Sequence, residues 1–346
     1  MKISFATTLV GLDARGERRW NVDDFVAEIQ AGDRLGFYGA YTGERRGRGP
    51  ASGKTGVAYS PDLLCSLGLA RTESLVFNSH VTLLPIHHPV RVVQDACVVN
   101  SLFPGRFRLG VGAGYTEDDF RAFGVSRKER GKRMEQGLQA IRAFLDGRTM
   151  TMDGPFYGEV PELDPAMGGH IPDVLAGAWS EPGVLRAARY TDGWFTGPIR
   201  TVEAEAELAR LYRAECERLG KPSRIVLMRE AAIAPTDEQA RQVWGQHLLD
   251  YARIYYERGG TYEERWDPWV ADVESADDIT LDMVLPDRFL CGSPDTWLES
   301  INSWRTTIQP DEILLRLRYY YGPSLQEALH AMELVGREII PAVATW

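Results

Sequence analysis

Residues 105–119 read GRFRLGVGAGYTEDD, in which an apolar strand pattern passes into three alternating glycines and then an acidic turn. The glycines carry no side chains where the strand would end, so a flat ligand could lie against bare main chain. A dinucleotide-binding fingerprint would need a further glycine at Tyr115 or Glu117 and is therefore excluded. The run predicts either a surface for a flat ligand or a strand end that lets a helix pack closely.

A second candidate is the run GAWSEPG at residues 177–183, which joins an apolar strand pattern to a helical one. At the start of a helix the main-chain N–H groups are unpaired and carry partial positive charge, and Ser180 adds a hydroxyl group. That combination suits a phosphate group. The alternative is that Ser180 caps its own helix. A serine hydrolase is disfavoured, because the run lacks the glycine that a nucleophile elbow has two residues before its serine.

Polar side chains also occur at the ends of two other predicted strands. Glu44 and Arg45 follow the second strand, in a cluster of basic residues that either attracts an anionic ligand or lies in a solvated loop. His80 lies in the third strand, where an imidazole that titrates near neutral pH could donate a proton, stack on a ring, or simply pack. The pair His87 and His88 has no third ligand at metal spacing, so we predict no metal site.

Strands and helices alternate along the chain and must position these candidates. The apolar patterns predict strands at residues 2–9, 38–43, 74–83, 107–111, 173–177, 193–197, 224–234 and 312–319. Eight strands that alternate with helices, without a break in composition, predict a single α/β domain over residues 1–346, a parallel (β/α)8 TIM barrel. In that fold the active site lies where the strands end.

One connection is much longer than the others. Residues 259–286 precede the eighth strand, contain several aromatic and acidic residues, and show little periodicity. A loop of this length inside a compact domain is usually functional. We therefore expect an insertion that acts as a lid over the site.

Charge and cysteine usage limit the class of protein. The 346-residue chain has 39 basic and 49 acidic residues and a formal net charge of -10, which disfavours nucleic acid and anionic membranes as partners. Its four cysteines are scattered without a C-x-x-C pair, as expected of reduced core residues. No apolar run is long enough to span a membrane, and no cleavable signal precedes the first strand. We expect a soluble, cytoplasmic protein.

Three segments together resemble the bacterial luciferase-like flavin-dependent monooxygenase family: LPIHHPVRVVQDACVVNSLFPGRFRLGVGAGYTEDDFRAFG, PDVLAGAWSEPGVLRAARYTDGWFTGP and REAAIAPTDEQAR. The resemblance implies a barrel that binds FMN, usually reduced and supplied by a partner reductase, and that uses dioxygen to oxidise a small organic substrate. It also implies a homodimer. Two alternatives stay open: a hydride-transfer oxidoreductase that uses a deazaflavin, and a flavin-binding protein without turnover.

The resemblance assigns roles to individual residues. Ser180 matches a serine that bonds the flavin phosphate, and Ser79 with His80 matches a pair that often forms a non-prolyl cis peptide beneath the flavin ring. Ala113 stands where some members have a phosphate-binding arginine, and Arg45 where luciferases have a catalytic histidine, so light emission is not expected. Arg45 and His80 are the candidates to protonate or orient the oxygen species. Predicted cofactor-binding residues are Glu44, Ser79, His80, Gly112, Ala113, Gly114, Tyr115, Ala176, Gly177, Ser180 and Glu181; Trp179, Phe195, Trp266 and Trp269 suggest an apolar or planar substrate.

Overall fold

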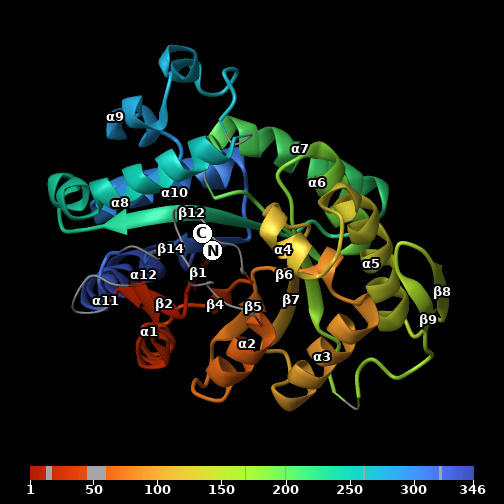
Figure 1. The fold of residues 1–346 in the computed structure, drawn as a ribbon. Coiled ribbons are helices and arrows are strands. Elements are labelled where there is room, and N and C mark those ends of the chain that lie inside the picture. The colour runs from red at the N-terminus through yellow and green to blue at the C-terminus, as the bar shows by residue number, and fades with distance from the viewer. Residues whose placement is uncertain (13–17, 45–59, 168, 199, 260–261, 319–321) are drawn as a thin grey trace. The chain divides into compact units, whose positions relative to one another are not determined.

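The computed structural model describes residues 1–12, 18–44, 60–167, 169–198, 200–259, 262–318 and 322–346. Figure 1 shows these residues as a ribbon with strands and covering helices. They form two compact units. Unit 1 consists of residues 1–38, 196–210 and 225–346, and unit 2 of residues 39–195 and 211–224.

Unit 2 is built on a parallel sheet. Its neighbouring strands are, in order, β4 (Gly39–Thr42), β5 (Val76–Ser79), β7 (Phe107–Gly112), β10 (Asp173–Gly177) and β11 (Gly193–Phe195). The short strand β6 (Thr82–Leu83) pairs with the last residues of β7. Every residue of β4 and β7 is buried, as expected for parallel strands that are covered on both faces.

The helices of unit 2 begin where the sequence places a helix-starting residue. Pro61 and Pro89 occupy the first turns of α2 and α3, where a missing N–H group costs nothing. The helices are α2 (Pro61–Leu69), α3 (Pro89–Leu102), α4 (Glu117–Ala122), α5 (Arg130–Leu145) and α6 (Glu181–Tyr190), with the short helices η1 (Leu84–Ile86) and η2 (Arg127–Glu129) between them. The hairpin β8 (Met150–Asp153) and β9 (Tyr157–Val160) follows α5, and α7 (Val202–Arg218) spans both units.

Unit 1 contains the first and last strands of the chain. Its parallel strands are, in order, β1 (Lys2–Ala6), β14 (Glu312–Arg316), β12 (Ile225–Ile233) and β13 (Phe289–Gly292). Its helices are α1 (Val22–Arg34), α8 (Asp237–Arg258), α10 (Pro294–Thr307), α11 (Leu325–Leu334) and α12 (Ile340–Val343), with the π-helical turn η5 (Val335–Ile339) before the last. The hairpin β2 (Val10–Leu12) and β3 (Arg18–Trp20) precedes α1.

The insertion at residues 259–286 has more structure than its sequence predicts. It contains η3 (Pro268–Asp272), η4 (Ala276–Asp278) and α9 (Leu281–Val284), and Ile279 and Val284 are fully buried. Arg253 of α8 donates hydrogen bonds to the carbonyl oxygens of Asp277 (2.8 Å) and Ile279 (2.9 Å). The described part of the insertion therefore packs on α8, and its action as a lid stays a prediction.

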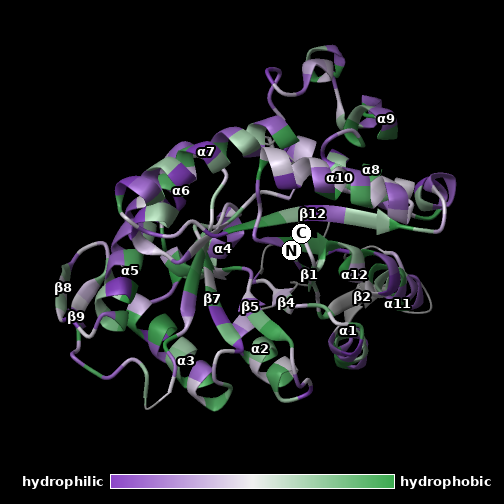
Figure 2. Cartoon of the chain, turned by 180° about the vertical axis from the view of Figure 1, so that it is seen from behind, coloured by the Kyte–Doolittle hydropathy of each residue, from purple (hydrophilic) through white to green (hydrophobic). Residues whose placement is uncertain are grey.

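All eight predicted strands are present, but one further strand and two hairpins were missed. Strand β13 and the hairpins β2–β3 and β8–β9 are short and lack a sustained alternation of apolar residues. Figure 2 shows both polar and apolar residues on long helices such as α3, α5 and α8, as expected of helices that bury one face and expose the other. Among the residues that the structure describes, no helix is long and apolar enough to cross a membrane.

Candidate functional site

The ends of β7 and β10 bring two of the predicted runs side by side. Gly112 pairs with Gly177 in the parallel register, so the residues that follow both strands leave the sheet at the same edge. Tyr115 and Trp179 are 41% and 37% exposed, and their rings lie 6.0 Å apart with an interplanar angle of 34°. We call these two loops, residues 113–115 and 178–181, the rim. The rim offers an open surface with a pair of aromatic rings.

Ser180 does not cap its own helix. It is the residue before α6, its backbone is extended (φ -137°, ψ 153°), and its side chain makes no capping hydrogen bond. The Ser180 hydroxyl therefore stands exposed at the positive end of the α6 dipole, with the open N–H groups of the first turn. Pro182 removes one of those groups, and the Glu181 carboxylate opposes an anion there. An anion at this helix start would need a further positive charge.

Arg130 supplies a positive charge that sequence reasoning missed. This first residue of α5 is half-buried, and its Nη1 atom donates a hydrogen bond to the Gly114 carbonyl oxygen at 3.2 Å. No carboxylate among the described residues forms an ion pair with it. The signal was available, because Arg130 opens a helix that follows the glycine-rich loop. Arg130 and Ser180 are the groups that the rim offers to a phosphate.

Two of the three alternating glycines make room for the neighbouring strand. A Cβ atom at Gly110 would lie 1.8 Å from the carbonyl oxygen of Ser79, and one at Gly112 would lie 2.4 Å from Cγ2 of Val81. The absence of side chains at these two positions therefore serves strand packing, and a cofactor contact with the main chain of Gly112 stays a prediction. Gly114 has a positive φ of 68° and turns the chain toward Tyr115.

His80 is held at the end of β5. Its main-chain N–H group donates to the Thr42 carbonyl oxygen at 2.7 Å. Its half-buried ring meets Phe195 edge-on at a centroid distance of 4.9 Å. The non-prolyl cis peptide bond joins His80 to Val81, one bond later than the sequence predicts, because Ser79 is still part of the strand. The Ser79 hydroxyl donates to the Gly110 oxygen at 3.0 Å and accepts from the Gly110 N–H at 2.9 Å, so its only proton is used within the protein, and a contact of Ser79 with a cofactor stays a prediction.

Glu44 is buried, and its carboxylate acts on the protein itself. The Leu83 N–H donates to Oε2 at 2.7 Å, and Oε1 lies 2.7 Å from Nε2 of His87. None of the Glu44 side chain is exposed in the cofactor-free protein, and its contact with a cofactor stays a prediction. Burial, followed by the negative charges of Glu44 and Asp95, raises the pKa of the nearby Asp62 to about 7. The buried Glu44 thus has two further carboxyl groups, those of Asp62 and Asp95, and one imidazole in its surroundings.

Residues 1–308 match the sequence model of the luciferase-like monooxygenases. The chain belongs to this family. A protein of Mycobacterium tuberculosis, itself uncharacterized, is 34% identical over 163 residues, which are 46% of this chain and 55% of that protein. Limonene 1,2-monooxygenase of Rhodococcus erythropolis is 28% identical over 162 residues, 46% of this chain and 41% of the enzyme. The chain thus spans about half the length of these relatives.

Solved structures resemble this luciferase-like monooxygenase family member over nearly its full length. The oxygenating constituent of 3,6-diketocamphane monooxygenase from Pseudomonas putida, solved with FMN, has a TM-score of 0.77 at 19% identity and covers 99% of this chain and 98% of its own. An F420-dependent secondary alcohol dehydrogenase, solved with an F420–acetone adduct, has a TM-score of 0.73 at 14% identity, with coverage of 99% and 98%. These similarities confirm the predicted fold, a (β/α)8 TIM barrel.

The remaining predicted site residues of this family member are distributed over both units. In unit 2, Ala176 and Phe195 are buried, and Phe195 contacts the His80 ring. In unit 1, the Arg265 guanidinium lies 4.2 Å from the centroid of the Trp266 ring, and Trp269 meets Tyr262 edge-on at 5.1 Å. Both tryptophans belong to the insertion, and their contact with a substrate stays a prediction. Arg45 lies outside the described residues.

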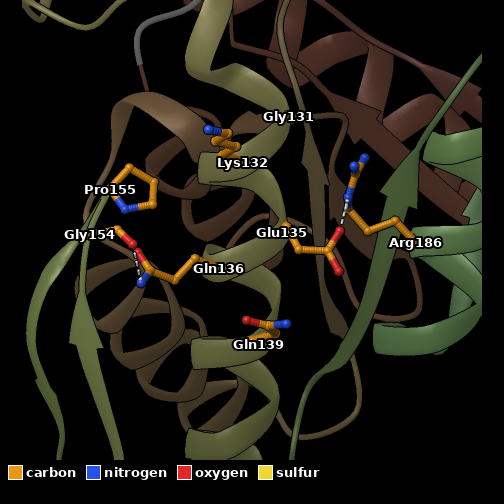
Figure 3. Close-up of a pocket in the computed structure, with 8 residues that line it drawn as sticks. All are labelled: Gly131, Lys132, Glu135, Gln136, Gln139, Gly154, Pro155 and Arg186. Carbon is orange, nitrogen blue, oxygen red and sulfur yellow. Dashed lines mark hydrogen bonds and ion pairs between the residues drawn. The ribbon is translucent and has the colours of Figure 1, made fainter.

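An open groove of unit 2 in the described part of the chain is separate from the predicted site. It has a volume of about 510 Å³ and is lined by Gly131, Lys132, Glu135, Gln136, Gln139, Gly154, Pro155 and Arg186. Figure 3 shows that two of its charged side chains pair, with Nε of Arg186 at 2.6 Å from Oε2 of Glu135. None of the predicted site residues lines this groove. Within the described residues no group of three metal-binding side chains occurs.

Proposed function

We propose that this protein is a flavin-dependent monooxygenase that uses reduced FMN and dioxygen to oxidise a small, apolar or planar organic substrate. A separate reductase would supply the reduced flavin. The observation that carries the proposal is that the loops after β7 and β10 leave the sheet at the same edge. Arg130 donates to one of them at Gly114, the uncapped Ser180 lies in the other, and a pair of exposed aromatic rings lies between them. The family membership of the chain agrees with it.

The rim fits the phosphate end of FMN. A phosphate group needs hydrogen-bond donors and positive charge, and the Ser180 hydroxyl, the first N–H groups of α6 and the Arg130 guanidinium provide both. Ala113 carries no charge at the position where some members of the family have a phosphate-binding arginine. Arg130, the first residue of α5, supplies a positive charge instead. The contact between Arg130 and the Gly114 carbonyl keeps the guanidinium near the rim. Riboflavin, which has no phosphate, should therefore bind much more weakly than FMN.

The chain's own residues have modest chemical tasks once a flavin is bound. Reduced flavin supplies the electrons and activates dioxygen. Tyr115 and Trp179 offer flat apolar surface that excludes water from a planar ligand. His80 can hold or deliver a proton at its imidazole, and Phe195 and Tyr41 fix the orientation of that ring by edge-on contacts at 4.9 and 5.7 Å.

A deazaflavin-dependent hydride transfer is the second candidate. It is supported by the similarity to the F420-dependent alcohol dehydrogenase and by the small side chain of Ala113. The two reactions differ in their need for oxygen, since hydride transfer to or from a deazaflavin consumes none.

Oxygen uptake separates these functions. The purified protein is mixed with enzymatically reduced FMN, or with reduced F420, and with a panel of apolar and planar substrates. The proposal expects substrate-dependent oxygen consumption with reduced FMN and oxygenated product by mass spectrometry. Turnover with F420 alone, without oxygen uptake, would replace it with the second candidate, and flavin binding without any turnover would indicate a binding protein.

A further inference from the structure

The His87 imidazole contacts a buried carboxylate that no sequence motif connects with it. Its Nε2 atom lies 2.7 Å from Oε1 of Glu44, whose side chain is wholly buried, whereas 26% of the His87 side chain is exposed. Phe123 meets the imidazole edge-on at a centroid distance of 5.3 Å. The contact joins the connection before α3 to the residue that follows β4.

Glu44 holds the turn that carries His80. Its N–H group donates to the Val81 carbonyl oxygen at 3.3 Å, and its Oε2 atom accepts from the Leu83 N–H at 2.7 Å. Gly43 lies so close to this turn that a Cβ atom there would be 2.4 Å from the His80 oxygen. A shift of the Glu44 carboxylate therefore moves residues 80–83.

The carboxyl groups around Glu44 favour an imidazole at the position of His87. Asp62 of α2 and Asp95 of α3 both act on the same region, and Arg91 pairs with Asp95 at an exposed position, 2.7 Å away. A buried carboxylate beside other carboxyl groups needs a hydrogen-bond donor or a positive charge. His87 provides a donor, and a positive charge whenever it is protonated.

We propose that His87 is a positioning residue of the candidate flavin site: through Glu44 it holds the 80–83 turn, and with it the His80 imidazole, in place. The expected effect of His87 on turnover rests on the proposed function. The expected effect of His87 on the position of His80 concerns the cofactor-free protein and does not depend on that function.

The neighbouring His88 is a natural control. It is exposed, and its Nε2 atom lies 3.3 Å from the Tyr157 carbonyl oxygen of the β8–β9 hairpin, so it points to a different part of unit 2. Substitutions at the two positions change the same residue type one residue apart. In the described contacts of the two histidines, His87 reaches Glu44 and His88 does not.

The first test uses histidine labelled with 13C at Cε1 alone, which gives six ring signals, one for each histidine of the chain. The His80 signal is assigned by its loss in His80→Asn. Without any flavin, His87→Ala should shift the His80 signal. His88→Ala should leave it in place, and His87→Gln, which keeps an N–H donor for Glu44, should shift it less than His87→Ala. An unchanged His80 signal in His87→Ala would overturn the inference.

The second test measures turnover and flavin affinity in the same variants. We expect kcat to fall about tenfold or more in His87→Ala, because small displacements of a reacting group are costly, while the Kd for FMN stays within about twofold. His87→Gln should recover most of the loss. Equal losses in His87→Ala and His88→Ala, or a loss only in FMN affinity, would contradict a positioning role. A wild-type protein without flavin turnover would refute the proposed function but not the His80 signal shift.

Discussion

Two buried glutamates, one in each unit, are held in contrasting ways. In unit 1, Oε2 of Glu28 accepts hydrogen bonds from Nη2 of Arg318 at 2.7 Å and from the Thr7 hydroxyl at 2.6 Å, and both partners of the ion pair are almost fully buried. In unit 2, Glu44 is equally buried, and its described contacts include the partly exposed imidazole of His87. One carboxylate faces a permanent charge and the other a titratable group.

We call the ion pair of Glu28 and Arg318 the structural lock, and the contact of Glu44 with His87 the adjustable contact. Burial opposes the charge of Arg318, but Glu28 outweighs this effect and raises the pKa of the guanidinium, so Arg318 stays charged at any ordinary pH. Histidine changes its charge near neutral pH. The adjustable contact lies beside the turn that presents His80, and the lock fastens the segment after β14 to α1. We infer that rigidity at Glu28 serves folding, whereas the contact at Glu44 serves the site.

The largest expected effect is on Glu28. The substitution Glu28→Gln leaves a buried guanidinium without its counter-charge, and we expect the free energy of unfolding to fall by about 3–5 kcal/mol in urea titrations. As a control, Asp95→Asn breaks the exposed pair with Arg91 and should cost about 1 kcal/mol or less. A loss at Glu28 as small as that of the control would remove the distinction between lock and contact.

An intermediate effect is expected at Asp62, beside Glu44. Its folded pKa of about 7 lies above the ordinary aspartate pKa of 3.8, so the folded state binds an extra proton between these values and stability falls as pH rises through that range. Wild type should therefore lose free energy of unfolding between pH 5 and pH 8, and Asp62→Asn should remove roughly 2 kcal/mol of that loss, after allowance for the partial exposure of Asp62. Unfolding midpoints at the two pH values measure it. Asp272→Asn, at an exposed position, should leave the pH dependence of wild type, and an unchanged dependence in Asp62→Asn would contradict the account.

The smallest expected effect is that of Glu44→Gln. The amide oxygen can still accept from the Leu83 N–H, and the amide nitrogen can donate to the imidazole, so no buried charge is left without a partner. We expect a loss of about 1 kcal/mol in the free energy of unfolding, several-fold less than for Glu28→Gln under the same conditions. Equal losses at the two glutamates would show that Glu44 also serves mainly as a lock.

Strand periodicity was sufficient to predict the barrel and the edge on which the rim lies. The apolar runs of β7 and β10 and the order of elements determined that Gly112 and Ser180 would lie on the same edge. Side-chain roles were harder to predict, because they depend on contacts between segments far apart in the chain. The sequence could not show that Val81 fills the space at Gly112, or that Glu44 turns inward to His87, 43 residues later.

Arg130 shows a different limit of sequence reasoning. Its run contains several basic residues, and composition alone does not distinguish them. Arg127 pairs with Glu117, and Arg133 donates to the Pro85 and Pro155 carbonyl oxygens, whereas Arg130 donates to the rim at Gly114. Only the rotation of α5 about its axis decides which arginine reaches the rim.

The central claim is that the rim binds the phosphate of a flavin through Ser180 and Arg130. Equilibrium titration of the protein with FMN and with riboflavin, followed by flavin fluorescence, tests it in wild type and in Ser180→Ala, Arg130→Met and the double variant. Wild type should prefer FMN by about tenfold or more, which corresponds to the loss of one charge-assisted contact of about 1.5–3 kcal/mol. The double variant should bind both ligands alike, and the controls Ser126→Ala and Lys132→Met should match wild type. An undiminished preference for FMN in the double variant would contradict the account.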